Sequence, residues 1–187
     1  MKRLLVPLLA VALLLTGCTE AGPASSSEGD LNEVVQQWDH PDTAPVTFTG
    51  TTVDGEKFDL ASTRGSVVVV NFWYNACSPC RAEAPILKSL ASEYEKDGVR
   101  FIGVNTRDDR ATAAAFDRQF DMNYPSVVDQ EGGSSAQLAF AGVRGPNTTP
   151  TTLVLDRKGR VTARYGALVN ESVLSTLIQD AVDGKAA

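Results

Sequence analysis

Cysteine and histidine are scarce in this sequence, which has three cysteines and one histidine. Its lysines and arginines form no cluster. A structural zinc site takes four ligands, mostly cysteine and histidine, so we expect no metal site. A Ser–His–Asp hydrolase would depend on the single histidine, His40, which lies beside Pro41 in a predicted linker. The 17 basic residues are scattered among 23 acidic ones, and the net charge is −6. This distribution argues against a nucleic-acid-binding surface.

The sequence also lacks an apolar run long enough to cross a bilayer in its first segment. Leu4–Leu15 is apolar, but at 1.5 Å per residue it spans roughly 18 Å, against about 30 Å of hydrocarbon. Lys2 and Arg3 precede the run, which is the layout of a secretory signal peptide. The sequence that follows it, Leu-Thr-Gly-Cys ending at Cys18, resembles the lipobox of bacterial lipoproteins. We therefore expect a signal peptide at 1–17 and a lipid on Cys18; the alternative is a secreted protein in which Cys18 is incidental.

A tether is expected between Cys18 and the folded domain. Ala21–Asp30 is rich in small and polar residues and has too little apolar surface to fold. Leu31–Trp38 is compatible with a short helix or with an arm that packs on the domain. The sequence thus divides into residues 1–17, a lipidated and flexible segment at 18–44, and one domain at 45–187.

The domain alternates strands and helices and then closes with a hairpin. Val67–Trp73 is an almost continuous β-branched and aromatic run, typical of a central strand that is covered on both faces. We expect a mixed sheet flanked by helices, because alternating elements pair in parallel and the late hairpin adds antiparallel strands. The other expected strands are 46–52, 57–60, 99–105, 125–129, 151–156 and 160–165, and the expected helices are 78–96, 110–120, 134–140 and 171–182.

Cys77 and Cys80 lie at the predicted start of the helix that follows this central strand. Their spacing brings the two sulfurs within bonding reach across one turn. The unpaired N–H groups at a helix N-terminus stabilise a thiolate, and cysteines so placed have pKa values of roughly 3.5–7.5. We expect Cys77 to be the exposed nucleophile and Cys80 the more buried, resolving cysteine. A structural disulfide is the alternative, but closing so short a loop adds little stability.

The sequence NFWYNACSPC and the RAEAP that follows it resemble the thioredoxin fold, and specifically its extracytoplasmic TlpA/ResA-like branch in the redoxin superfamily. The resemblance covers roughly Pro45–Val182. It implies a thioredoxin-fold domain with an N-terminal β-hairpin and a helical insertion between Val104 and Thr151. It also implies a cis-proline loop at Thr149–Pro150, whose backbone would pair with an extended partner segment. An ordinary trans proline at the start of a strand is the alternative.

Three positions set this sequence apart from cytoplasmic thioredoxins, or ally it with the TlpA/ResA-like branch. Asn71 stands where thioredoxins carry a buried aspartate, and Ala76 replaces the tryptophan before the first cysteine. Glu83 matches a glutamate of the TlpA/ResA-like branch and lies three residues after Cys80, on the same helix face. A carboxylate buried there would have a raised pKa and would handle the Cys80 proton or raise the pKa of Cys77; a solvated glutamate is the alternative. Trp73 matches an aromatic residue of the motif and is expected at the docking surface or in the core.

The resemblance implies a membrane-anchored thiol–disulfide oxidoreductase outside the cytoplasm, with a redox-active disulfide and no other cofactor. Its expected partners are protein disulfides, cytochrome c maturation among them, and a membrane electron donor such as a CcdA/DsbD-like thiol transporter. A reductant is favoured over an oxidant. Peroxiredoxin chemistry is disfavoured because Val70–Cys77 contains no Pro or Thr, and Sco-like copper binding because the cysteine spacing is one residue shorter. A lipoprotein that binds a partner or copper without turnover remains the alternative.

Overall fold

The computed structural model describes residues 34–39, 41 and 43–185. The predicted signal peptide, the predicted lipidation site at Cys18 and the single histidine lie outside the described residues. Within the part that is described, no helix combines the length and the apolar character needed to span a bilayer.

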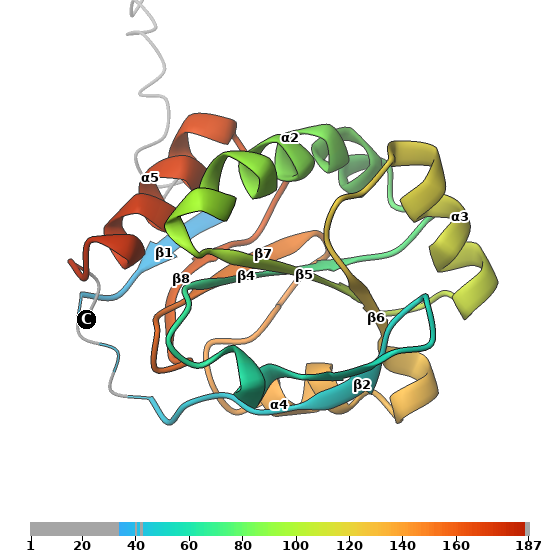
Figure 1. Ribbon diagram of the computed structural model, residues 1–187, viewed down its shortest axis with the longest axis horizontal. Helices are drawn as coiled ribbons and strands as arrows, with labels where there is room; N and C mark the ends of the chain where they lie inside the picture. Colours follow the sequence, from blue (N-terminus) through green and yellow to red (C-terminus); the bar gives the residue numbers. More distant parts are fainter. Residues whose placement is uncertain (1–33, 40, 42, 186–187) are drawn as a thin grey trace, which may run out of the picture.

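A six-stranded mixed sheet with the order β1-β8-β7-β4-β5-β6 forms the centre of the molecule (Figure 1). Neighbouring strands β4, β5 and β6 are parallel, whereas the β4–β7, β7–β8 and β8–β1 pairs are antiparallel. This is the thioredoxin-like arrangement that the sequence predicts. The strands are β1 (Val35–Gln37), β4 (Val68–Trp73), β5 (Arg100–Asn105), β6 (Ser126–Val128), β7 (Thr151–Leu155) and β8 (Val161–Tyr165).

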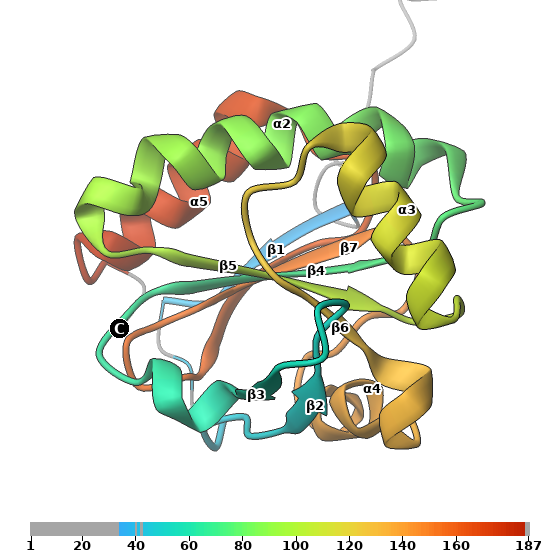
Figure 2. The same ribbon diagram turned by 45° about the vertical axis from the view of Figure 1, so that its right-hand side comes forward.

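Helices cover both faces of the sheet (Figures 1 and 2). On one face lie α2 (Ser78–Tyr94) and α5 (Glu171–Val182), with α3 (Arg110–Phe120) beside the N-terminal end of α2. On the other face lie α4 (Ser135–Ala141) and the hairpin of β2 (Thr49–Thr51) and β3 (Lys57–Asp59). The 3-10 turns are η1 (Leu60–Thr63), η2 (Glu95–Asp97) and η3 (Asp129–Gly132).

The central strand β4 is buried along its whole length, as the β-branched run predicts. Because side chains alternate along a strand, Val68, Val70 and Phe72 pack in the core cluster beneath the sheet with Phe140 of α4. Val69 packs on the opposite side with Leu87 and other residues of α2 and α5. Trp73, the last residue of β4, belongs to a third cluster that contains both cysteines. The strand therefore carries the site at its carboxyl end.

The sheet extends further toward the N-terminus than the predicted domain boundary at residue 45. Val35–Gln37 falls in the segment expected to be a tether, yet it forms β1 and pairs antiparallel with β8, Val35 lying opposite Tyr165. Of the two alternatives for Leu31–Trp38, the arm packed on the domain is the one observed for these residues. The physical reason is that β8 would otherwise present an unpaired edge.

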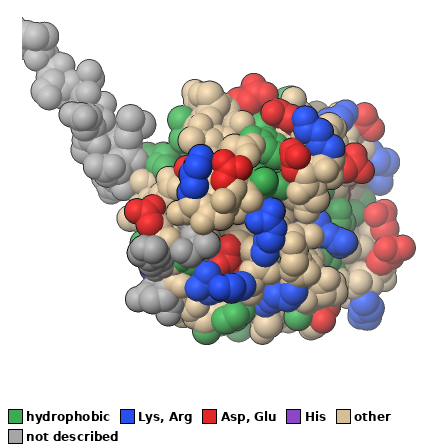
Figure 3. All heavy atoms as spheres, turned by 60° about the vertical axis from the view of Figure 1, so that its left-hand side comes forward, with side chains coloured by type: hydrophobic (Ala, Val, Ile, Leu, Met, Phe, Trp, Pro, Cys, Tyr) green, Lys and Arg blue, Asp and Glu red, His purple; other side chains and the backbone are tan. Residues whose placement is uncertain are grey.

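Charged side chains of both signs lie on the face that carries β1 and α5 (Figure 3).

Candidate active site

The two cysteines of the predicted redox pair form a disulfide at the N-terminus of α2, with their Cα atoms 5.2 Å apart. Cys77 is the N-cap residue, and the backbone N–H of Cys80 donates to its Sγ over 3.2 Å. Pro79 lies in the first turn, where its missing N–H leaves no intrahelical hydrogen bond unmade. The helix N-terminus thus points a donor at the sulfur that would carry negative charge after reduction.

The expected exposure of Cys77 is wrong for this oxidised form. Cys77 is 3% exposed and Cys80 is 1% exposed. The N-cap position turns the Cys77 side chain back toward the helix, where it packs in a cluster with Trp73 and Ala84. Its neighbours in the chain, Ala76, Ser78 and Pro79, are exposed, so the disulfide lies just under a surface segment.

The connection between β4 and α2 is held by a carboxylate from the β5–α3 loop. Asp108 accepts hydrogen bonds from the backbone N–H of Asn75 over 2.6 Å and from the side chain of Asn105 over 2.8 Å. Arg81, one turn into α2, donates to the Asn75 side chain over 3.2 Å. These bonds fix the path of the chain just before Cys77.

Trp73 belongs to the core beneath the disulfide and does not form a docking surface. Its side chain is 2% exposed, and its ring lies 4.1 Å from that of Phe116 on α3. The alternation of β4 directs Trp73 toward the helices, because Phe72 occupies the other face. Of the two expectations for this residue, the core position is the observed one.

The peptide bond between Thr149 and Pro150 is cis, as the resemblance implies. The loop ends where β7 begins, and Thr151 lies opposite Phe72 in the β4–β7 register. Pro150 is therefore beside the carboxyl end of β4, the end that leads to Cys77. Thr149 is half-buried and Pro150 is buried.

An open groove of about 350 Å³ runs between this loop and the start of the β4–α2 connection. Thr149 lines it from the loop, and Tyr74 lines it from the residue that follows β4. The Arg107 guanidinium covers the Tyr74 ring at 4.2 Å. Neither cysteine lines the groove, and Tyr74, three residues before Cys77, is the lining residue nearest to the pair in the chain.

Glu83 is fully buried, with 0% exposure, one turn beyond Cys80 in α2. One carboxylate oxygen accepts from the side-chain amide of Asn71 over 2.7 Å, and the other accepts from the Val169 N–H over 3.2 Å. Desolvation raises its pKa to about 7, although the two hydrogen bonds act in the opposite direction. The expected buried carboxylate is present, and the solvated alternative is wrong.

A polar row crosses the sheet under α2 and α3. Thr152, Asn71, Gly103 and Ser126 are neighbours in the registers of β7, β4, β5 and β6. Asn71 donates to Glu83 and also to the Thr152 hydroxyl over 3.1 Å. Asparagine here thus holds the carboxylate in place, whereas an aspartate would set a second negative charge beside it.

Gly103→Ala is expected to destabilise the protein by about 1–3 kcal/mol through overpacking. A Cβ at this position would lie 2.8 Å from the indole nitrogen of Trp73 and would also clash with the Ser126 hydroxyl. Urea denaturation of the oxidised protein measures the loss. Gly142→Ala is the matched control, because its Cβ would meet no atom within 4 Å. A Gly103→Ala variant as stable as this control would contradict the packing described.

The sequence reasoning missed Asp117, Tyr124 and Ser126, which surround Cys80 in a small cavity with Asn71. Asp117 had a readable signal. Residues 113, 116 and 120 form the apolar face of α3, and position 117 falls on that same face. An aspartate among apolar positions indicates a buried polar contact.

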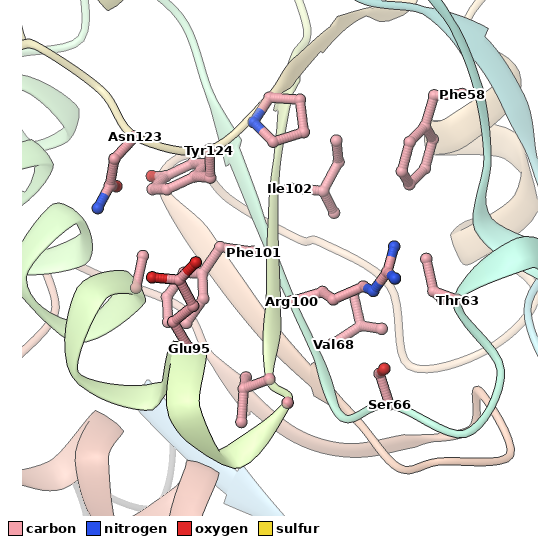
Figure 4. A pocket seen from close by; sticks show the side chains of 14 residues that line it. Phe58, Thr63, Ser66, Val68, Glu95, Arg100, Phe101, Ile102, Asn123 and Tyr124 are labelled. Carbon is pink, nitrogen blue, oxygen red and sulfur yellow. The ribbon is translucent and has the colours of Figure 1, made fainter.

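A further hollow of about 520 Å³ lies away from the cysteines (Figure 4). Val68 and Arg100 line it, and these are the first residues of β4 and β5. The disulfide follows the opposite end of β4. This hollow therefore plays no part in the chemistry of the pair.

Comparison with known proteins agrees with this geometry. The model of the Redoxin family matches residues 40–177. The chain is similar to the thiol-disulfide oxidoreductase ResA of Geobacillus thermodenitrificans, with 33% identity over 64% of this chain and 64% of the relative. Its similarity to the ResA of Halalkalibacterium halodurans is 26% identity over 72% of this chain and 73% of that relative.

Solved structures give the same result. A secreted thiol-disulfide isomerase from Corynebacterium glutamicum superposes with a TM-score of 0.70 and 26% identity, covering 84% of this chain and 95% of that one. A secreted Mycobacterium tuberculosis disulfide oxidoreductase homologous to DsbE gives a TM-score of 0.60 and 28% identity, covering 71% and 94%.

A thioredoxin-like sheet that presents a C-x-x-C disulfide at a helix N-terminus beside a cis-proline defines a thiol–disulfide oxidoreductase. Within that class, the chain belongs to the Redoxin family.

Proposed function

We propose that this protein is a lipid-anchored, extracytoplasmic oxidoreductase that reduces disulfides in selected partner proteins. The Cys77–Cys80 disulfide at the start of α2 is the observation that carries the proposal. Cys77 attacks the partner disulfide, and Cys80 then resolves the mixed disulfide. The pair is the only redox centre required, and electrons return to it from a membrane thiol transporter.

Substrate docking is assigned to the cis-proline loop. Thr149 and Pro150 lie beside the carboxyl end of β4, and the open groove next to them has room for an extended segment. A partner segment paired with this loop would bring its disulfide to Cys77. The exposed Ala76, smaller than a tryptophan, leaves the surface beside the cysteines open to selected partners, such as proteins of cytochrome c maturation.

The buried Glu83 carboxylate supports the reducing direction. A disulfide is a strong oxidant when its reduced form is stabilised as a thiolate. Ionised Glu83, one turn from Cys80, disfavours a thiolate there and so favours the oxidised pair. A pair that prefers to be oxidised donates its electrons readily.

Extracytoplasmic placement rests on the sequence and on relatives. Leu4–Leu15, followed by the lipobox-like residues before Cys18, directs export and acylation. Two acyl chains give stable membrane anchoring, where one chain gives only marginal binding. The relatives from Corynebacterium glutamicum and Mycobacterium tuberculosis are secreted proteins.

The reduction potential of the Cys77–Cys80 pair tests the direction. Equilibration of the domain with glutathione or dithiothreitol redox buffers should give a value near −270 mV, which is the range of thioredoxin. A value near −120 mV, which is the range of strongly oxidising pairs, would overturn the assignment as a reductant.

A further inference from the structure

The aspartate on the apolar face of α3 shares a small inner cavity with the resolving cysteine. Asp117 and Cys80 line the same small cavity, of about 10 Å³. Asn71, Tyr124 and Ser126 contribute further polar groups to its wall. A polar cavity of this size holds about one water molecule. The cavity that Cys80 and Asp117 line thus has room for one water molecule.

Asp117 also lines an open groove on the outside of the molecule, of about 720 Å³. The turn of the β2–β3 hairpin and the last turns of α3 form the walls of this groove, and Arg118 and Asp121 belong to it. Cys80 does not line the outer groove. Asp117 is therefore the acidic side chain that stands between the inner cavity and solvent.

The charge state of Asp117 fits a group that exchanges protons. Burial raises its pKa to about 6, the negative charge of Asp54 adds to the increase, and a hydrogen bond from Ser126 opposes it. Its Oδ1 atom is buried without a hydrogen-bond partner among the described residues. The other titratable or charged side chains around it are Asp54 and Glu56 of the hairpin turn, Arg118 and Asp121 of α3, Tyr124 of the α3–β6 segment, and Cys80 of α2.

We propose that Asp117 carries the proton between the Cys80 thiol and solvent, through one water in the inner cavity. The proposal rests on the proposed function, in which Cys80 must lose a proton before it resolves the mixed disulfide. It assigns to Asp117 a positioning and relay role beside the reacting sulfur.

The Cys80 thiol gives its proton to the cavity water, and that water gives one of its own protons to the Asp117 carboxylate. The Cys80 thiolate attacks the Cys77 sulfur of the mixed disulfide, so that the Cys77–Cys80 bond forms and the bond to the partner breaks. The partner leaves as a thiolate with the electron pair. The dithiol has lost two electrons to the partner, and Asp117 releases its proton into the outer groove.

Glu83 is less suited to this proton exchange with solvent, although it lies only one turn from Cys80 in α2. Both of its carboxylate oxygens already accept hydrogen bonds, from Asn71 and Val169. It is fully buried and lines neither the inner cavity nor the outer groove. Tyr124 lies close enough to feel the charges of both acids. Burial raises the pKa of Tyr124, and the negative charges of Glu83 and Asp117 raise it further.

The test is a single-turnover measurement of mixed-disulfide resolution. The reduced protein is reacted with a thionitrobenzoate disulfide, and release of thionitrobenzoate from Cys77 by Cys80 is followed by stopped flow between pH 5 and 10. For the unaltered protein, the rate should rise through about pH 6, where Asp117 ionises. Asp117→Asn should be slower by about 10²-fold at pH 7, which is the range for loss of a general base. The difference should shrink to a few-fold near pH 10, where hydroxide removes the proton.

Two matched variants separate the relay from structure. Asp121→Asn removes a charge from the outer groove without touching the inner cavity and should leave the pH profile unchanged. Asp54→Asn keeps Asp117 but removes the charge that raises its pKa, so the rise in rate should move to lower pH.

The outcomes distinguish the two proposals. If the unaltered protein does not release thionitrobenzoate, the proposed function itself fails. If it does, but Asp117→Asn has the same profile or is slowed equally at every pH, only the relay is overturned. A rise in rate that does not move in Asp54→Asn would also count against the relay.

Discussion

Cys77→Ser is expected to reduce disulfide exchange to the rate of the uncatalysed reaction. The variant retains only Cys80, which lies inside the first turn of α2, whereas Cys77 is the N-cap residue at the end of the helix. Only a thiolate attacks a disulfide, and a serine hydroxyl does not replace it. Reduction of insulin by the reduced domain measures the activity. Binding of a partner segment in the groove beside Thr149 should survive, because the groove does not include Cys77.

Cys80→Ala should accumulate the mixed disulfide between Cys77 and a partner protein. Cys77 still attacks a partner, but without the resolving thiol the mixed disulfide persists. Non-reducing electrophoresis should show disulfide-linked species that disappear on reduction, and the double variant Cys77→Ser/Cys80→Ala should show none. If Cys77→Ser keeps its activity, or if Cys80→Ala traps no partner, the exchange mechanism is wrong.

Glu83→Gln is expected to change how stability depends on pH by about 3 kcal/mol. Burial raises the pKa of this carboxyl to about 7 in the folded protein, against an ordinary value of 4.5. Between these values the folded state holds a proton that the unfolded state has lost. Stability therefore falls as pH rises from about 4.5 to 7, and the loss is complete above this window. Glutamine does not titrate, so the variant should lack this part of the decrease.

Urea denaturation of the oxidised proteins at pH 4.5 and pH 8 measures the effect. The stability of Glu83→Gln relative to the unaltered protein should improve by about 3 kcal/mol between the two pH values. At low pH the variant should be the less stable of the two, because glutamine has one acceptor oxygen for the N–H groups of Asn71 and Val169. Glu93 lies exposed on the same helix, and Glu93→Gln is the control that should leave the pH dependence unchanged. If the difference in the free energy of unfolding between Glu83→Gln and the unaltered protein is the same at pH 4.5 and pH 8, Glu83 is not buried as described.

Local patterns were enough to predict most of the fold. The β-branched run of β4 and the helical spacing of α2 place both elements within a few residues of their observed bounds. Boundaries were less exact where pairing decides them, as in the short strands β2 and β6. No local pattern predicts the edge strand β1, since Val35–Gln37 becomes a strand only because β8 offers it an unpaired edge.

The sequence predicts which residue types form the site better than it predicts how deeply each side chain is buried. The N-cap geometry that makes Cys77 a favourable thiolate also turns its sulfur inward, so one sequence feature has two consequences with opposite effects on access. Trp73 could have been surface or core, and the ring of Phe116, 43 positions later, decided it. Such contacts join residues far apart in the chain, and no local pattern encodes them.

The sequence by itself determined the chemistry of this protein: two cysteines three residues apart after a buried strand, a proline able to adopt the cis form ahead of another strand, and a carboxylate one turn beyond. These are short-range features, and the preference of a helix N-terminus for negative charge acts on them directly. Only the tertiary structure decided which acids lie near the cysteines. Glu83 acquires its raised pKa from the elements packed over it, and Asp117 lines one cavity with Cys80 because α3 and the segment that leads into β6 pack against α2 there. Desolvation depends on everything that surrounds a group, so it is settled only when the chain has folded.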